Sequence, residues 1–161
     1  MSDAGDAAGP EADEASTFTQ QSLGYQVNLL ARMMEQALAR RIRPHGVVPG
    51  QFAQLLSLYE NDGQSVTELA ATVAIEHSTM SRTLTRMERD GLVTVRPHPT
   101  DGRSRQIHLT DHARALKPLL LAEAAEVNRS FLELFSSAQA EKLLALTRAA
   151  TDAHGSSATE G

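Results

Sequence analysis

The sequence predicts a mainly α fold with one small β-hairpin (α+β), on three observations. Apolar residues recur at intervals of three and four through most of residues 23–150, which is the spacing of amphipathic helices. Ser65 and Ser136 are each followed three positions later by a glutamate or a glutamine, a pattern that caps the start of a helix. An Asp-Gly pair at residues 101–102 lies between two short alternating stretches and is typical of a hairpin turn.

The chain has 161 residues, enough for one domain with a sizeable core. Residues 1–20 contain five acidic residues and no basic ones, so we expect a disordered acidic tail there, and residues 155–161 form a second expected tail. The predicted domain therefore covers residues 21–154. Because the sequence has no cysteine, no apolar stretch long enough to span a membrane and no signal-peptide pattern, we expect a cytoplasmic protein without disulfides or thiolate metal sites.

Two helices are expected first. The apolar series that begins at Leu23 predicts a long helix over residues 21–43, which Pro44 ends. Pro49 suits the first turn of a second helix, and the Asn-Asp-Gly turn at residues 61–63 ends that helix.

The next two helices form a helix-turn-helix pattern. Ser65 and Glu68 make a capping box at the start of a short helix. After a tight break over residues 74–77, Ser78 is the expected N-cap of a second helix, which runs to Asp90 and stops at Gly91.

The hairpin and two more helices complete the chain. Strands are expected over residues 92–95 and 106–109. Thr110 or Asp111 then caps a long helix that contains Pro118, which should kink the helix or mark a boundary near its start. The capping box that begins at Ser136 opens the last helix.

The second helix of the helix-turn-helix pair has one face without acidic residues. At about 100° per residue, Met80, Leu84 and Met87 cluster on the buried side. The other side carries serine, threonine and arginine: Ser78, Ser81, Arg82, Thr85, Arg86 and Arg89. These residue types contact phosphates and base edges in the major groove of DNA. Residues 77–117 hold eight basic and four acidic residues, which favours DNA binding over an ordinary solvated helix face.

The hairpin follows this recognition helix directly, so it is expected to be a wing. An arginine at the tip of a wing can enter the minor groove, where it reads groove width and negative potential. Arg103 is the expected probe, and Asp101 is expected to orient its guanidinium by a charge-assisted hydrogen bond. Arg105 is a second candidate DNA contact, and the alternative for the whole segment is a solubilising loop tip.

These stretches resemble a known family. ELAATVAIEHSTMSRTLTRMERDGLV at residues 68–93 and PTDGRSRQIHLTDHA at residues 99–113 are similar to the MarR family of winged helix-turn-helix regulators, and the resemblance extends over nearly all of residues 23–150. It implies a winged helix-turn-helix domain at about residues 50–110, with N- and C-terminal dimerisation helices at about residues 21–43 and 111–154. It also implies a homodimer on a pseudo-palindromic operator, with Arg103 at the wing tip and Thr79 facing DNA beside the residues named above.

The same resemblance implies a pocket for a small aromatic or amphipathic ligand between the dimerisation helices and the winged domain. We expect its lining to come from Tyr25, Leu29, Met33, Arg43, His45, Phe52 and Leu116. Arg43 and His45 are suited to meet a carboxylate. The alternative is that the methionines belong to the dimer core and Arg43 to the surface.

The sequence therefore predicts a dimeric, sequence-specific DNA-binding transcriptional regulator, a repressor relieved by a small ligand, with no cofactor. The alternatives are an activator, a regulator without a ligand, a metal-responsive sensor, and a protein-interaction module that does not bind DNA. His98, His108 and His112 are close in sequence, but their spacing crosses from strand to helix and does not secure a metal site. We expect no enzyme, because no nucleophile elbow, phosphate-binding glycine loop or paired carboxylates occur.

Overall fold

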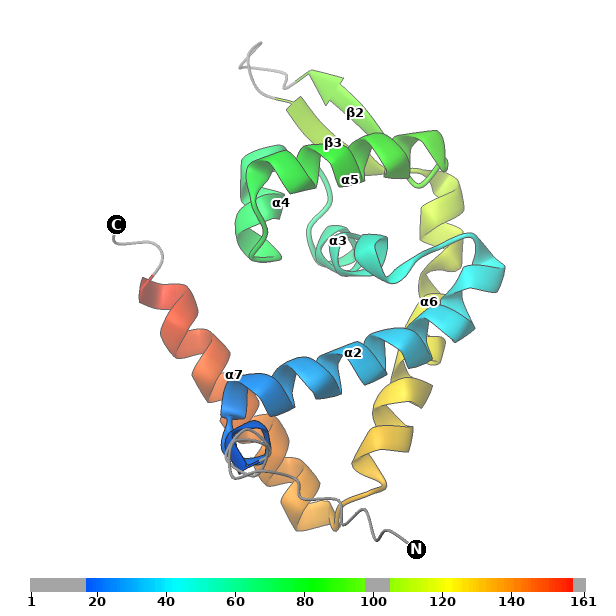
Figure 1. The fold of residues 1–161 in the computed structure, drawn as a ribbon. Coiled ribbons are helices and arrows are strands. Elements are labelled where there is room, and N and C mark those ends of the chain that lie inside the picture. Colours follow the sequence, from blue (N-terminus) through cyan, green and yellow to red (C-terminus); the bar gives the residue numbers. More distant parts are fainter. Residues whose placement is uncertain (1–16, 98–104, 158–161) are drawn as a thin grey trace, which may run out of the picture.

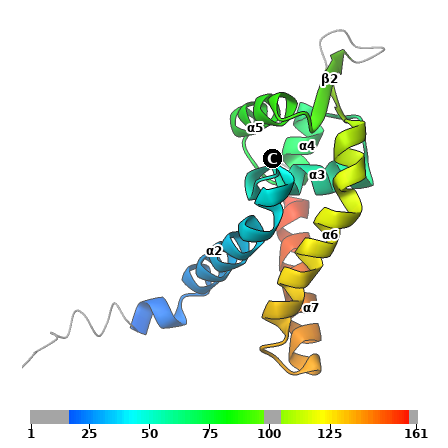
Figure 2. The same ribbon diagram turned by 90° about the vertical axis from the view of Figure 1, so that its right-hand side faces the viewer.

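A three-stranded sheet and three helices packed on it form one end of the molecule, and longer helices extend away from it (Figures 1 and 2). The computed structural model describes residues 17–97 and 105–157. Most of the predicted acidic tail and the wing tip, with Asp101 and Arg103, lie outside the described residues.

The first two predicted helices are confirmed. Helix α2 (Leu23–Ile42) starts at Ser22, whose Oγ accepts a hydrogen bond from the Tyr25 amide over 3.3 Å. It continues into the short 3-10 helix η1 (Arg43–His45), which ends at Gly46 with a φ of 77°. Helix α3 (Pro49–Glu60) follows, with the predicted proline in its first turn.

The helix-turn-helix pair consists of α4 (Val66–Thr72) and α5 (His77–Arg89). The predicted capping box is present, because the Glu68 amide donates to Ser65 Oγ over 3.2 Å and the Ser65 amide donates to Glu68 Oε2 over 2.8 Å. The prediction that Ser78 is the N-cap of the second helix is wrong. The first helical bond runs from the Met80 amide to the Glu76 carbonyl over 2.9 Å, so Ser78 already lies in the first turn.

The predicted hairpin is confirmed as strands β2 (Val93–Pro97) and β3 (Arg105–Leu109), paired antiparallel with Val95 opposite Ile107. A third strand, β1 (Gln64–Ser65), pairs with the other edge of β3, which gives the order β1-β3-β2. Strand β1 was not predicted, because two residues are too few to show an alternating pattern.

Helix α6 (Asp111–Leu132) begins at Thr110, whose Oγ1 accepts from the Ala113 amide over 3.1 Å. Pro118 lies inside this helix, which continues past it, so Pro118 is not a helix boundary. Helix α7 (Ser137–Ser157) starts at the predicted capping box of Ser136 and extends into the segment expected as the C-terminal tail.

The core lies between the sheet and helices α3, α4, α5 and the first half of α6. Its largest fully buried side chains come from every one of these elements, from the end of α2 and from two adjoining loops: Ile42, Val47, Leu55, Leu58, Leu69, Met80, Met87, Leu92, Val93, Ile107 and Leu120. Helix α7 packs little against the rest of the described chain, and its described side chains are almost all exposed. The winged unit therefore has a core of its own, while α7 and the N-terminal half of α2 do not contribute to it.

Candidate nucleic-acid interface

Helix α5 lies across one end of the molecule, next to the sheet (Figure 1). Its inner side buries Met80, Leu84 and Met87, as the helical wheel predicts, and also Thr83. Its outer side exposes every residue that the sequence analysis assigned to DNA from this helix: Ser78, Thr79, Ser81, Arg82, Thr85, Arg86 and Arg89. The structure therefore gathers these side chains on one accessible face, and Thr79, Arg82, Thr85 and Arg86 line a shallow hollow on it.

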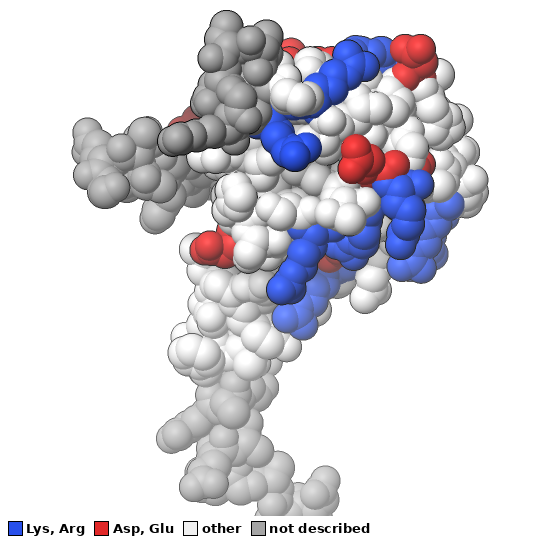
Figure 3. Space-filling view, turned by 90° about the horizontal axis from the view of Figure 1, so that it is seen from above, with Lys and Arg blue, Asp and Glu red and all other residues white. Residues whose placement is uncertain are grey.

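The face that carries α5 and the sheet is rich in basic side chains. Figure 3 views this face, where Lys and Arg cover more of the surface than Asp and Glu. The chain as a whole has a formal net charge of −5, so the basic groups are concentrated rather than evenly spread. Such a face attracts a polyanion even though the average charge of the protein is negative.

The three arginines of α5 differ in how far they are already engaged. Within the described residues Arg82 has no hydrogen-bond or ion-pair partner. Arg86 Nη2 makes a long hydrogen bond of 3.4 Å to Thr83 Oγ1 on its own helix. Arg89 is paired with Asp90 over 3.0 Å. Arg82 is therefore the arginine most available to an incoming phosphate or base.

The Arg89–Asp90 pair is held by a buried residue of α3. Gln51, which is 2% exposed, donates from Nε2 to Asp90 Oδ2 over 2.8 Å. The hydrogen bond from Arg89, followed by that from Gln51, lowers the pKa of the Asp90 carboxyl, so Asp90 stays charged beside the arginine. From the sequence, Gln51 has no assigned role and Asp90 only marks the end of the helix, because this contact joins residues far apart in the chain.

Two hydroxyls on the exposed face bond back to their own helix. Ser81 Oγ donates to the His77 carbonyl and Thr85 Oγ1 donates to the Ser81 carbonyl, each over 3.0 Å. Their hydrogens are therefore engaged, while the oxygen lone pairs remain open to donors such as the amino groups of adenine or cytosine.

The two strands of the wing, β2 and β3, lie beside α5. The Val95 amide donates to Glu88 Oε1 over 3.4 Å, which ties β2 to the recognition helix. Arg96 and Arg105 lie exposed near the outer ends of β2 and β3. The predicted contact Arg105 is therefore accessible, whereas the predicted probe Arg103 and its partner Asp101 lie outside the described residues.

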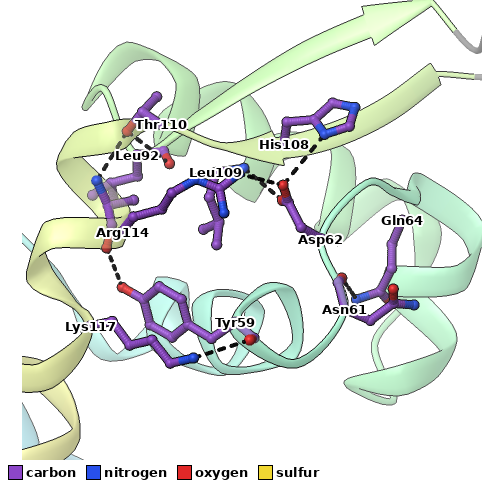
Figure 4. Close-up of polar contacts among 11 residues, drawn as sticks. Tyr59, Asn61, Asp62, Gln64, Leu92, His108, Leu109, Thr110, Arg114 and Lys117 are labelled. Carbon is purple, nitrogen blue, oxygen red and sulfur yellow. Dashed lines mark hydrogen bonds and ion pairs between the residues drawn. The ribbon is translucent and has the colours of Figure 1, made fainter.

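The inner end of β3 is held by the carboxylate of Asp62, at the end of α3 (Figure 4). Asp62 Oδ1 accepts from the Leu109 amide over 2.8 Å, and Oδ2 accepts from Arg114 Nη2 over 2.6 Å. His108 Nδ1 lies 3.5 Å from the same Oδ2. Burial raises the pKa of Asp62, but the bonds from Leu109, Arg114 and His108 outweigh it, and the pKa is lowered. The turn predicted at residues 61–63 is present, but the role of this carboxylate was not predicted.

A mostly apolar cavity of about 540 Å³ lies between α2, α3 and α6. Its lining comes from these three helices: Met34, Glu35, Leu38, Pro49, Phe52, Ala53, Leu56, Leu121, Ala124, Ala125, Val127 and Asn128. Of the expected ligand residues, the structure brings only Phe52 to this cavity. Tyr25, Leu29 and Met33 lie exposed on α2, Arg43 is exposed, His45 lies in η1, and Leu116 packs against the core.

Two other kinds of site are absent from the described ranges 17–97 and 105–157. No group of three or more histidine, aspartate or glutamate side chains is arranged there to hold a metal ion. No helix there has the length and apolar character needed to cross a membrane.

Comparison with known proteins gives consistent matches. Residues 45–104 match the sequence model of the MarR family. The HTH-type transcriptional regulator YybA of Bacillus subtilis (strain 168) is 22% identical over 121 residues, which are 75% of this chain and 81% of YybA. A probable transcriptional regulator from Pseudomonas aeruginosa is 26% identical, with a TM-score of 0.75 over 80% of this chain and 96% of that one. The transcriptional repressor CouR, solved bound to a 23-mer DNA duplex, is 27% identical, with a TM-score of 0.71 over 83% and 95% of the two chains.

Proposed function

Because the chain is a winged-helix transcriptional regulator of the MarR family, we propose that it is a homodimeric repressor that binds a pseudo-palindromic operator and is released by a small ligand. Helix α5 enters the major groove, and the wing lies beside the adjacent minor groove. The two half-sites are then centred about one helical turn apart.

One observation carries the DNA-binding role: the outer face of α5 presents Arg82 and Arg86 among serine and threonine side chains, without an acidic residue between them. Arginine reads guanine bidentately, while serine and threonine tolerate several bases. The DNA duplex in the solved CouR structure supports the same use of the fold here. Arg103 remains the proposed wing-tip probe, and Arg105 a proposed phosphate contact.

The proposed dimer rests on apolar surface that this chain alone leaves uncovered. On α2, Leu23, Val27 and Leu30 are 78%, 54% and 40% exposed. On α7, Leu144 and Leu146 are 43% and 60% exposed. Helices α2 and α7 lie at the end of the molecule away from α5 (Figure 1), so a second copy can cover them and leave both recognition helices open. Exposed apolar patches of this kind mark association surfaces.

The cavity between α2, α3 and α6 is the proposed ligand site. Its polar groups are Glu35 and Asn128, and no basic side chain of the described chain lines it. This lining favours an apolar or cationic amphipathic compound over the aryl carboxylate suggested by Arg43 and His45.

The test of DNA binding starts from a duplex that the wild-type protein selects from a random pool. The affinity for this duplex is measured as a function of salt for the wild type, for Arg82→Ala and for Arg148→Ala, a matched control on α7. We expect steep salt dependence for the wild type and weaker binding for Arg82→Ala only. Failure to select any duplex at low salt would contradict the proposal and favour a protein-interaction module.

A further inference from the structure

We propose that Asp62 is a positioning residue for DNA binding, which holds the wing and the start of α6 in one fixed arrangement. This inference rests on the proposed function, because it concerns the affinity for DNA. Asp62 itself lies just after α3, beside the inner end of β3 (Figure 4), and it acts through β3 and α6.

Strand β3 pairs with β1 over only two residues, and Asp62 extends this edge by one hydrogen bond. Strand β1 bonds to β3 only at Gln106 and Ile107, and the Gly63 amide adds one bond to the Ile107 carbonyl over 3.0 Å. The Leu109 amide lies one step beyond this short strand, and Asp62 Oδ1 accepts from it over 2.8 Å. The carboxylate thus takes the place of the next backbone carbonyl and completes the inner edge of β3.

Asp62 also links β3 to helix α6. Arg114, in the first turns of α6, donates to Asp62 Oδ2 over 2.6 Å, so one carboxylate bonds both to β3 and to this helix. The side chains of Asp62 and Arg114 are 26% and 51% exposed, which leaves the pair partly shielded from water. A charge-assisted bond of this length is stronger and more directional than a neutral one.

The turn formed by Asp62 and Gly63 also contacts His108 on β3. Its Nδ1 lies 3.5 Å from Asp62 Oδ2, and a Cβ atom at Gly63 would meet its Cε1 at 3.0 Å. The φ of Gly63 is +81°, which other residues resist. The turn therefore places the Asp62 carboxylate and Gly63, which has no side chain, against the imidazole of His108. This contact holds β3 in place.

The anchor at the inner end of β3 controls the position of the outer end of the strand. Strand β3 runs from this anchor at Leu109 to Arg105 at its outer end, a span of about 13 Å at about 3.3 Å per residue. A small rotation at Leu109 is therefore amplified at the outer ends of β2 and β3, where Arg96 and Arg105 are exposed. Loss of the anchor should cost the phosphate contacts that the wing contributes.

The sign of the effect separates this role from simple electrostatics. Removing a negative charge from the protein should by itself tighten binding to a polyanion. Asp62→Asn removes that charge and also weakens the bonds to Arg114 and His108. If Asp62 positions the wing, the affinity falls instead.

The experiment compares Asp62→Asn with Asp111→Asn on the duplex selected by the wild type. Asp111 is an exposed aspartate in the first turn of α6, without a hydrogen-bond or ion-pair partner within the described residues. We expect Asp62→Asn to bind about tenfold more weakly and its salt slope to flatten by about one unit. Asp111→Asn should bind as well as the wild type or more tightly, with an unchanged slope.

The salt slope is the readout that a merely structural role would not move, because a lower fraction of folded protein changes the apparent concentration and not the slope. Equal or tighter binding by Asp62→Asn would overturn the inference while leaving the proposed function intact. If no duplex is selected at all, the inference falls together with the proposed function. Should Asp62→Asn not fold, Arg114→Lys keeps the charge but not the guanidinium geometry. Weaker binding by Arg114→Lys supports the role, and unchanged binding overturns it.

Discussion

Gln51 on α3 donates a hydrogen bond from its buried Nε2 to Asp90 Oδ2 at the end of α5, over 2.8 Å. Asp90 is in turn paired with Arg89. A buried side chain of α3 therefore holds the carboxylate that pairs with one arginine of α5. The proposed interface therefore contains three arginines in three different states: Arg82 without a partner in the described residues, Arg86 bonded to Thr83, and Arg89 paired with Asp90.

These states predict unequal effects on DNA affinity. Arg82→Ala should cost roughly 1–3 kcal/mol and lower the salt slope by about one unit, because Arg82 has no partner within the described residues. Arg89→Ala should cost less, since Asp90 already neutralises this arginine. Fluorescence anisotropy on the selected duplex measures both, and equal losses would contradict the ranking. Asp90→Asn serves as the converse variant and should tighten binding, because it frees Arg89.

Replacing each of two buried glutamines of α3 by methionine is expected to affect stability differently. Gln51→Met removes the bonds to Asp90 and to the Val48 amide, so the free energy of unfolding should fall by about 1–3 kcal/mol. Gln54 is 4% exposed, and its Oε1 has no hydrogen-bond partner in the described part of the chain. Gln54→Met should therefore leave stability unchanged or raise it, since it removes a buried unpaired acceptor. Urea unfolding of the two variants provides the measurement, and similar destabilisation by both would refute this assignment.

The lowered pKa of Asp62 predicts a loss of stability in acid. A carboxyl whose pKa is lower in the folded state stabilises the fold fully above its unfolded pKa, which is near 3.9. This contribution is lost as the pH falls from about 4 through the folded pKa. Asp62→Asn should therefore unfold with a shallower dependence on pH in this range than the wild type, as measured by thermal melts between neutral and acid pH. Parallel curves for the two proteins would show that Asp62 makes no such contribution.

The uncovered faces of α2 and α7 predict a dimer. Leu30→Asp and Leu146→Asp place a charge where a second copy would bury a leucine, so each should shift the protein from dimer to monomer. Light scattering at several concentrations measures the mass. Ala145→Asp puts the same side chain at an exposed position of α7, about 100° around the helix from both Leu144 and Leu146, and should keep the dimer. A monomeric wild type would contradict this prediction directly.

The cavity predicts where a ligand acts. Ala125→Leu adds volume inside its lining, while Ala122→Leu adds the same volume at an exposed position of α6 outside it. For any compound that releases the wild type from DNA, the first variant should need a higher concentration and the second should respond normally. Both should bind DNA as the wild type does. A response unchanged by Ala125→Leu would move the ligand site elsewhere.

Most of the helices and the hairpin could be predicted from residues that lie close together in the sequence. Capping boxes at Ser65 and Ser136, the proline at Pro49 and the apolar spacing of α5 each depend on residues within one or two turns, so the sequence alone shows them. The predicted start of α5 lies two residues too late, because helical bonding begins at the Glu76 carbonyl although no side chain caps the helix there. Strand β1 escaped notice because its two residues are defined only by their partner strand.

The interface divides in the same way. The exposed face of α5 follows from helical periodicity, and the structure places all of its predicted side chains outside. The links from Gln51 to Asp90 and from Asp62 to Arg114 join positions 39 and 52 residues apart, and no periodicity or motif announces such pairs. The cavity lining was missed for a related reason, since it depends on which faces of α2 and α6 meet and not on residue type.

Helix α6 starts at the Asp62 anchor and, farther along, forms one wall of the cavity. A single helix of 22 residues, about 33 Å long, therefore has one end at the wing and the other beside the proposed ligand. Thermodynamic linkage makes such an arrangement reciprocal. A compound that lowers the affinity for the operator by a given factor is itself held more weakly, by the same factor, on the operator-bound protein, so the operator acts as an antagonist of the compound that dislodges it.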